Sequence, residues 1–392
     1  MKKLLYLSFA FPPGIQIFVP GINPAGHKFE TDMFFSIRNL FDIKSVGVLP
    51  FCPSNLLPDV DLKSGIPHDL ILVDKRPEIF NRIISLYLLK KHYLKLLSNG
   101  WVPDYILVYN LSPIYNNFLI WLKKHTRRPK IILLLLDSAQ LGSNFPFIKR
   151  FRYFFKPLVI RDLKMLPLFD ACVGLSKSTR LFFKNKDIPF LWMPGACSLD
   201  NIYKKSSFDC NNTGPIQFGY FGALAPHSGI IDLLKVFLKC SLPIELKIFG
   251  FGRLSTDIAK MAQADRRLIF SGLLPTIEDC RRFVSSCDVL VNPRPLTHGN
   301  QNNFPSKIFE YVICKKSILT TRISGVYDVL GSEAFYLDEA HLEDSLHNSL
   351  ESISKLDRSE LSRRGSIIFD RVISHFSWNH QANAISNFIN SL

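Results

Sequence analysis

Residues 292–311 read Asn292-Pro-Arg-Pro-Leu-Thr-His-Gly-Asn-Gln-Asn-Asn-Phe-Pro-Ser-Lys-Ile-Phe-Glu-Tyr311. The run 288–291 before this stretch predicts a short buried strand. Apolar residues at helical spacing after Pro305 predict a helix over 306–316, which Ser306 can cap. The polar residues between these two runs show neither a strand nor a helix pattern. This order of strand, polar loop and helix start favours an anion site in an α/β protein, although an ordinary surface loop has the same pattern.

The length of 392 residues predicts two domains of ordinary size. Hydrophobic residues make up 47% and charged residues 21%, so each half can bury a core. No stretch reaches ~18 consecutive apolar residues, and we expect no transmembrane helix. The N-terminal residues 1–14 begin like a signal peptide, but the apolar run is short and ends in two prolines. A buried first strand is therefore the better interpretation.

The eight cysteines are scattered, with no C-x-x-C pair and no histidines at zinc spacing. This pattern favours reduced thiols in a cytoplasm and predicts no metal site.

The positive charge is concentrated in the first half of the chain. Residues 1–200 hold 27 Lys and Arg against 14 Asp and Glu, whereas residues 201–392 hold 21 against 19. Such an excess indicates an anionic partner: a nucleic acid, a phosphorylated substrate or the cytoplasmic face of a membrane. Segment 145–161 interleaves aromatic and basic residues, which favours peripheral contact with an anionic membrane. A core helix with a solvated basic face remains open, and nucleic-acid binding has only the net charge in its favour.

Strand and helix patterns alternate in both halves, which predicts parallel sheets with helices on both sides. The stretch 200–214 is rich in polar residues and marks the domain boundary. We therefore expect domains at 1–205 and 214–370, with a C-terminal helix over about 376–392 that packs back on the first domain. A long helix over 79–97 mixes basic and apolar residues. The predicted strands are 4–11, 43–49, 105–109, 130–136, 171–175, 216–222, 245–249, 268–270, 288–291 and 317–320.

Asp137 directly follows the buried strand 130–136. Open α/β sheets place their ligands at this end of their strands. Asp137 is thus a candidate for the acceptor side of a site, and capping of the next element is an equally good interpretation.

The second half resembles the GT-B glycosyltransferases of family 4, and within them the bacterial enzymes of capsule and O-antigen assembly. The resemblance depends on the order of several motifs, none of which is specific alone. It implies two Rossmann-like, doubly wound domains that face each other across a cleft. It also implies transfer of a sugar from a nucleotide-sugar donor with retention of configuration, and no metal or other cofactor. The motifs are Tyr220-Phe-Gly-Ala-Leu224, Ser228-Gly229, Ile248-Phe-Gly-Phe-Gly252, Phe270-Ser-Gly272, Asp288-Val-Leu-Val-Asn-Pro-Arg294, Asn303-Phe-Pro-Ser-Lys-Ile-Phe-Glu-Tyr311 and Ile318-Leu-Thr-Thr-Arg-Ile-Ser-Gly325.

The resemblance also assigns residues to a site. Glu310 would bind the ribose hydroxyls, because a carboxylate accepts two hydrogen bonds. The helix start at Ser228 and Gly229 would point its dipole at the diphosphate. Asp137 and Asn302 join the candidate catalytic set with Arg294 and Lys307. The other residues assigned to the nucleotide sugar are Gly222, Gly250, Gly252, Gly272, Asn303 and Phe304.

Three positions depart from the family pattern. Ala223 and Ser228 stand where the family has an Arg and a Lys that neutralise the leaving diphosphate. Asn302 stands where the family has its first glutamate. Since transfer needs the leaving group stabilised, Arg294 and Lys307 are the cations that we expect to replace the missing ones.

The sequence therefore predicts a retaining glycosyltransferase of cell-surface polysaccharide biosynthesis. It would act on a lipid-linked or saccharide acceptor from the cytoplasm, as a peripheral protein on the inner face of the membrane, without binding nucleic acid. The alternative is a non-catalytic GT-B partner that binds another transferase or the membrane.

Overall fold

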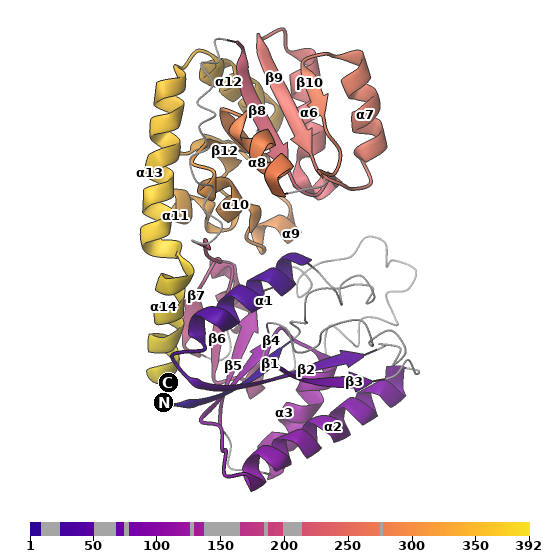
Figure 1. Ribbon diagram of the computed structural model, residues 1–392, viewed down its shortest axis with the longest axis vertical. Coiled ribbons are helices and arrows are strands. Elements are labelled where there is room, and N and C mark those ends of the chain that lie inside the picture. The colour runs from indigo at the N-terminus through magenta and orange to yellow at the C-terminus, as the bar shows by residue number, and fades with distance from the viewer. Residues whose placement is uncertain are drawn as a thin grey trace. The chain divides into compact units, whose positions relative to one another are not determined.

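The computed structural model describes residues 1–8, 24–50, 68–73, 78–125, 129–136, 165–183, 187–198, 214–274 and 277–392. Asp137, segment 145–161 and the predicted boundary lie outside these residues. The chain divides into two compact units, each described by itself (Figure 1). Unit 1 comprises Met1–Pro194 and Trp378–Leu392, and unit 2 comprises Gly195–Ser377. Within the described residues, no helix is long and apolar enough to cross a membrane.

Unit 1 contains a seven-stranded parallel sheet in the order β3-β2-β1-β4-β5-β6-β7. The chain builds outward from β1 to one edge and then returns to β4 on its other side. This reversal is the topological switch point at which doubly wound sheets hold their ligands. The strands are β1 (Lys3–Ser8), β2 (Asp42–Pro50), β3 (His68–Val73), β4 (Tyr105–Tyr109), β5 (Lys130–Leu135), β6 (Ala171–Gly174) and β7 (Phe190–Trp192).

Successive side chains of a strand point to opposite faces of the sheet, and the unit 1 strands carry apolar side chains on both faces. Helices therefore cover both faces of this sheet. Helices α2 (Glu78–Ser98) and α3 (Pro113–His125) pack on the face that carries Leu5 and Leu7. Helix α1 (Pro24–Ile37) packs on the face of Tyr6. Helix α14 (Trp378–Asn390) lies beside α1, where the Trp378 and Phe29 rings meet edge to face with centroids 5.2 Å apart (Figure 1).

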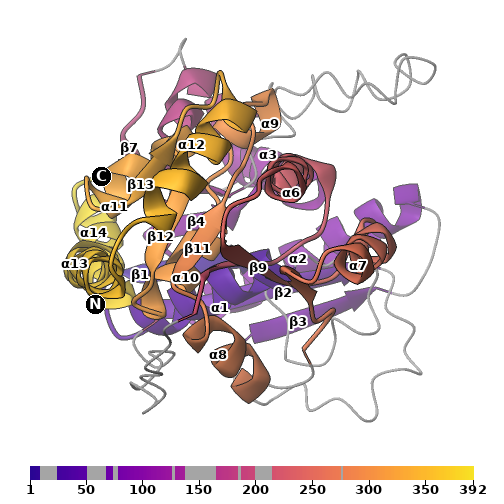
Figure 2. The ribbon, with the colours of Figure 1, turned by 90° about the horizontal axis from the view of Figure 1, so that it is seen from above.

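Unit 2 contains a six-stranded parallel sheet in the order β10-β9-β8-β11-β12-β13, with the same reversal between β8 and β11. Its strands are β8 (Ile216–Phe221), β9 (Ile244–Phe249), β10 (Leu268–Phe270), β11 (Val289–Asn292), β12 (Ser317–Thr321) and β13 (Phe335–Leu337). Figure 2 shows helices on both faces of this sheet. The helices are α6 (Ile230–Lys239), α7 (Ser255–Ala264), α8 (Ile277–Ser285), α9 (His298–Gln301), α10 (Lys307–Ile313), α11 (Val326–Leu330), α12 (Leu342–Ser354) and α13 (Arg358–Phe376).

Short 3₁₀ turns complete the two units. They are Leu166–Leu168, Lys177–Phe183, Pro226–Ser228 and Ile323–Gly325.

Every strand predicted from the sequence is present, with ends that differ by a few residues. Three strands, β3, β7 and β13, were not predicted. The sequence prediction ended the first half's sheet at 171–175, and this is wrong because β7 follows. The reason is physical: β7 and β13 have only three residues each, most of them half-buried, so they lack an apolar run. The loop prediction for 292–305 is also wrong in part, because α9 forms there. Thr297 caps α9 by accepting a hydrogen bond from the backbone N–H of Asn300 at 3.2 Å.

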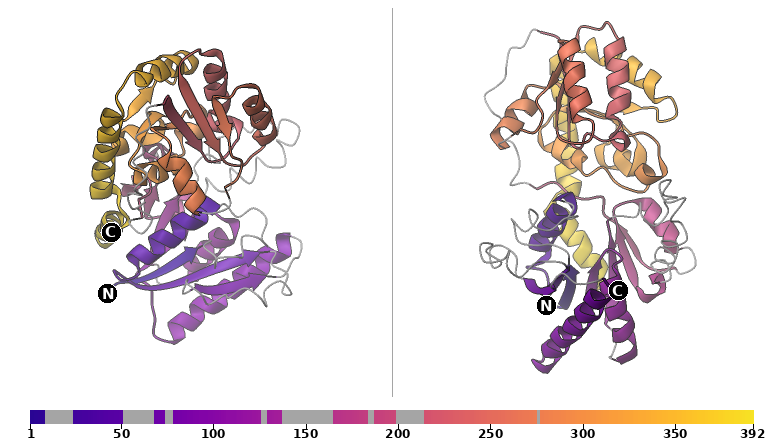
Figure 3. Two further views of the ribbon diagram at one scale, coloured as in Figure 1. Left: turned by 45° about the horizontal axis from the view of Figure 1, so that its top comes forward. Right: turned by 90° about the vertical axis from the view of Figure 1, so that its right-hand side faces the viewer.

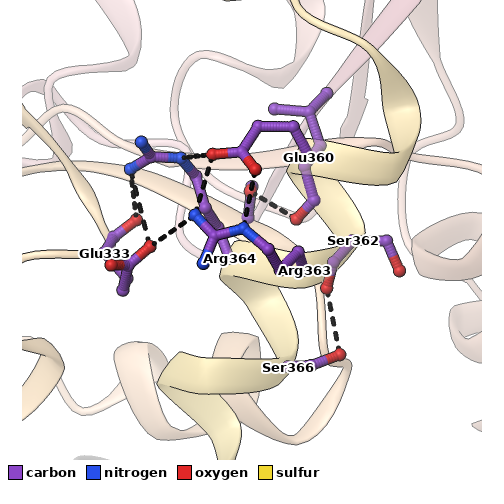
Figure 4. A network of polar contacts seen from close by, with 8 residues as sticks. Glu333, Glu360, Ser362, Arg363, Arg364 and Ser366 are labelled. Carbon is purple, nitrogen blue, oxygen red and sulfur yellow. Dashed lines mark hydrogen bonds and ion pairs between the residues drawn. The ribbon is translucent and has the colours of Figure 1, made fainter.

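Helix α13 supports the part of unit 2 that carries the candidate site. Two arginines of α13 join Glu360 on the same helix to Glu333, which lies just before β13 (Figure 4). The hydrogen bond from Arg363 lowers the pKa of Glu360 to about 2. One turn further on, α13 passes so close to the end of α10 that a Cβ on Gly365 would lie 2.4 Å from the carbonyl oxygen of Lys315. This contact holds the chain directly after α10 against α13.

Candidate functional site

The candidate residues of unit 2 gather at the carboxyl end of its sheet. Gly222 follows β8, Gly250 follows β9, Gly272 comes shortly after β10 and Arg294 shortly after β11. Parallel pairing of these strands brings their carboxyl ends to one edge. The structure therefore brings together residues that are up to 72 positions apart in the sequence.

The glycines let the loops at this edge pack directly on one another. A Cβ on Gly250 would lie 2.0 Å from the carbonyl oxygen of Gly222, and one on Gly229 would lie 1.7 Å from that of Pro293. A Cβ on Gly252 would likewise lie 2.3 Å from the carbonyl oxygen of Leu224. Gly250 and Gly229 also adopt positive φ angles of 149° and 78°. These contacts are between loops, and a role of the glycines toward a nucleotide stays a prediction.

Ser228 does not act as a helix cap. It ends the 3₁₀ turn, is buried, and its hydroxyl donates a hydrogen bond to the carbonyl oxygen of Ala225 at 2.7 Å. Gly229 then turns the chain in a left-handed conformation, and α6 begins at Ile230. The N-terminus of α6 lies at the carboxyl end of the sheet, but its first turn is positioned by Gly229 and not by a serine side chain.

Two cations converge at this edge. The Lys307 ammonium lies 4.1 Å from the ring centre of Tyr220 and 5.7 Å from that of Tyr311. Arg294 donates from Nη1 to the carbonyl oxygen of Asn303 at 3.1 Å. Burial, followed by the positive charge of Arg294, lowers the pKa of Lys307 to about 7. The charge of Glu310 acts in the opposite direction.

A third titratable group belongs to the same cluster. Burial lowers the pKa of His227, and the charges of Arg294, Lys307 and Arg253 lower it further. Burial also lowers the pKa of Arg294. Neighbouring cations repel one another, and an anion that binds among them relieves this repulsion and stabilises their charged forms. The arrangement is therefore suited to a multiply charged anion such as a diphosphate.

Helix α10 presents Lys307 and Glu310 on the same side, because residues three apart are neighbours on a helix. Tyr311 fixes the rotation of the helix: its buried hydroxyl lies 3.0 Å from the carbonyl oxygen of Val291 and 3.3 Å from that of Phe221. Glu310 is exposed. The predicted cap at Ser306 is wrong, since that side chain makes no capping hydrogen bond and α10 begins at Lys307.

The segment between β11 and α10 is held from several sides. Buried Asn300 donates to the carbonyl oxygens of His227 at 3.0 Å and Pro295 at 2.9 Å. Ser324 donates to the carbonyl oxygen of Gln301 at 2.9 Å. Asn302 and Asn303 are half-buried next to this anchor, and Phe304 is buried.

Sequence reasoning missed the positioning roles of Asn300, Tyr220 and Tyr311. Only Asn300 carried a sequence signal, as the residue three positions after a threonine that can cap a helix. The two tyrosines lie within apolar runs and read as ordinary core residues.

Anion binding at this cluster should weaken as the pH rises through about 7. The free protein loses the Lys307 proton in this range, so above it a bound anion must restore that proton at a cost in binding free energy. Sulfate is a suitable probe because it does not titrate there. Calorimetry at constant ionic strength should show tighter binding on the acid side and proton uptake on the basic side. Lys307→Met should remove most of this dependence, and an unchanged profile in that variant would contradict the assignment.

Comparison with solved structures shows which known proteins share this fold. The structure resembles the apo form of the lipopolysaccharide outer core galactosyltransferase WaaB, with a TM-score of 0.69, 13% identity and 99% of each chain covered. It also resembles HepE of Anabaena in complex with UDP and glucose (TM-score 0.67, 14% identity, 100% of each chain). A third likeness is to sucrose-phosphate synthase of Thermosynechococcus elongatus (TM-score 0.68, 13% identity, 100% of this chain and 99% of that chain). No curated protein sequence matches the chain.

The two parallel-sheet units and these likenesses define a GT-B fold. Residues 215–354 match the family model described as "Glycosyl transferases group 1". The protein thus has a GT-B fold, and its second unit is similar over residues 215–354 to the group 1 glycosyl transferases. The predicted fold class is confirmed, and the predicted family is supported for the second unit by the match over residues 215–354. The roles of the individual site residues stay predictions.

Proposed function

We propose that the carboxyl end of the unit 2 sheet binds a nucleotide sugar, and that the protein transfers the sugar with retention of configuration. The observation that carries this proposal is the pairing of Lys307 and Arg294 beside the exposed Glu310. A nucleoside diphosphate offers a dianionic or trianionic group next to a pair of ribose hydroxyls. The cluster of cations and the carboxylate, one helical turn apart, complement these two features.

In this proposal the bond from the sugar's anomeric carbon to the diphosphate oxygen breaks, and a bond from the same carbon to an acceptor hydroxyl oxygen forms. The hydroxyl proton leaves with the departing phosphate or with a nearby base. Lys307 and Arg294 stabilise the negative charge that grows on the diphosphate. They take the place of the charges that Ala223 and Ser228 lack. Glu310 accepts hydrogen bonds from the ribose, and Asn302, Asn303 and Phe304 face the donor sugar.

The acceptor is proposed to be a lipid-linked saccharide in capsule or O-antigen assembly. The similar protein WaaB is by its name a transferase of the lipopolysaccharide outer core, which supports an acceptor of this class. Asp137 remains the proposed residue of the acceptor side. We also propose a peripheral location on the cytoplasmic face of the membrane, with segment 145–161 as one contact.

A non-catalytic GT-B partner is the second candidate, because Ala223, Ser228 and Asn302 all replace residues of the family pattern. A turnover assay distinguishes the two candidates, because only an active transferase releases nucleoside diphosphate. Purified protein with common nucleotide sugars and a membrane extract as the source of acceptor should release nucleoside diphosphate. Absence of release from every common nucleotide sugar would favour the non-catalytic partner.

Glu310→Ala should raise the KM for the nucleotide sugar by about 10- to 100-fold, since each lost hydrogen bond to a charged group is worth about 1.5–3 kcal/mol. The value of kcat should change much less, because the ribose contact is made in ground and transition states alike. Glu351→Ala is a matched control, as Glu351 is another helical glutamate of unit 2 whose partner is the surface residue Lys355. A Glu310→Ala enzyme with unchanged KM would contradict the ribose assignment.

A further inference from the structure

The outer face of α2 carries an apolar stripe. Phe80, Ile83, Tyr87 and Leu94 are 59%, 60%, 63% and 50% exposed. Their spacing of three, four and seven residues places them along one side of the helix. We call these four residues the α2 stripe.

The opposite side of α2 already forms the core of unit 1. Leu89, Tyr93 and Leu96 are buried there and pack with residues of the sheet and of α3. A surface helix of a soluble protein normally places polar residues on its outer side. Among the described residues, no other helix or strand carries as many exposed large apolar side chains as α2. An apolar patch on this side thus marks a surface for binding.

Basic residues surround the α2 stripe. Lys91 and Lys95 are exposed on α2, and Lys90 of the same helix lies 5.1 Å from the ring centre of Trp121 on α3. The last turn of α3 adds exposed Lys123 and Lys124. Helices α2 and α3 lie side by side (Figures 1 and 3). Their sequences contain a single acidic residue, at the first position of α2.

We propose that the α2 stripe docks the protein on an anionic lipid surface, with the four apolar side chains in the interfacial layer and the lysines at the headgroups. An amphipathic basic helix with aromatic and aliphatic residues on its outer side binds such interfaces. A second copy of the chain fits less well, because a symmetric dimer through this face would oppose lysines to lysines. The proposal does not depend on the transferase chemistry, and it gives the described part of unit 1 a membrane-facing surface.

Vesicle flotation of the full-length protein tests this inference. The protein should bind mixed phosphatidylcholine–phosphatidylglycerol vesicles much more tightly than phosphatidylcholine alone. Ile83→Ser/Tyr87→Ser should weaken binding at least about tenfold at both low and high salt, because each buried methylene contributes about 0.8 kcal/mol. Lys91→Gln/Lys95→Gln should weaken binding at low salt by about fivefold per lysine and reduce its salt dependence. Ile367→Ser on α13 and Lys260→Gln on α7 are matched exposed controls.

Four results would overturn the inference. They are no vesicle binding by the wild type, equal binding to neutral and anionic vesicles, wild-type binding by both double variants, and a change of oligomeric state in the stripe variant on analytical ultracentrifugation. The third result would leave segment 145–161 as the contact. Circular dichroism and nucleoside diphosphate binding are measured on the same preparations, and the circular dichroism spectrum shows that each variant is folded. A protein that binds nucleoside diphosphate but not vesicles would contradict this inference alone, and one that binds vesicles but no nucleoside diphosphate would contradict the proposed donor site alone.

Discussion

Replacing Lys307 by methionine should lower kcat/KM for sugar transfer by about 100- to 1,000-fold, the usual cost of losing one group that stabilises charge in a transition state. Methionine keeps the length and apolar contacts of the lysine stem but removes the ammonium that lies over Tyr220. The loss should fall mainly on kcat, because the negative charge on the diphosphate increases as the bond to the sugar breaks. Steady-state release of nucleoside diphosphate gives both parameters.

Lys260→Met is the control for this prediction, since Lys260 is an exposed lysine on α7 of the same unit. It should keep wild-type kinetics. If Lys307→Met retains kcat/KM within a factor of about 2, then Lys307 does not face the leaving group and the charge that replaces the family's missing cations must come from elsewhere.

Gly229→Ala should destabilise unit 2 by about 2–4 kcal/mol, from the strain of a positive φ together with overpacking. The added Cβ would lie 1.7 Å from the carbonyl oxygen of Pro293, which is backbone and cannot rotate away. Either the loop after β11 or the start of α6 must move. The denaturant midpoint followed by circular dichroism measures the loss, and binding of nucleoside diphosphate should weaken with it.

Gly272→Ala provides the matched comparison. Gly272 also has a positive φ, of 63°, but a Cβ there meets nothing within 4 Å. This variant should lose only about 1 kcal/mol from backbone strain. Equal destabilisation by the two alanines would show that the close approach to Pro293 contributes nothing.

The sequence was most informative where burial produces regular patterns. Strands such as β5 and β9 are long enough to show apolar runs or alternation, and the order of the motifs in the second half predicted which strand ends meet. The site cations were predicted as a pair because Lys307 and Arg294 flank one polar stretch. Their interaction with Tyr220 was not predictable, since it depends on how α10 is rotated against β8, and Tyr311 fixes that rotation through main-chain contacts.

The α2 stripe shows a second limit. The sequence predicted a long helix with lysines among apolar residues, but a helix that is apolar on both sides has no unique inner face. Only packing against β2, β3 and α3 shows that Leu89 and Tyr93 point inward and that Ile83 and Tyr87 remain exposed. The short strands β7 and β13 were missed for the related reason that three residues give no periodicity.

The most direct test of the donor site compares two ligands and two variants by calorimetry. The ligands are the nucleoside diphosphate that binds best among UDP, GDP, ADP, CDP and dTDP, and its parent nucleoside. We predict that Lys307→Met weakens binding of the diphosphate by about 10- to 100-fold and leaves the nucleoside unaffected, whereas Glu310→Ala weakens both. Failure of the wild type to bind any of these diphosphates, or equal binding by both variants and the wild type, would contradict a donor site at the carboxyl end of the unit 2 sheet.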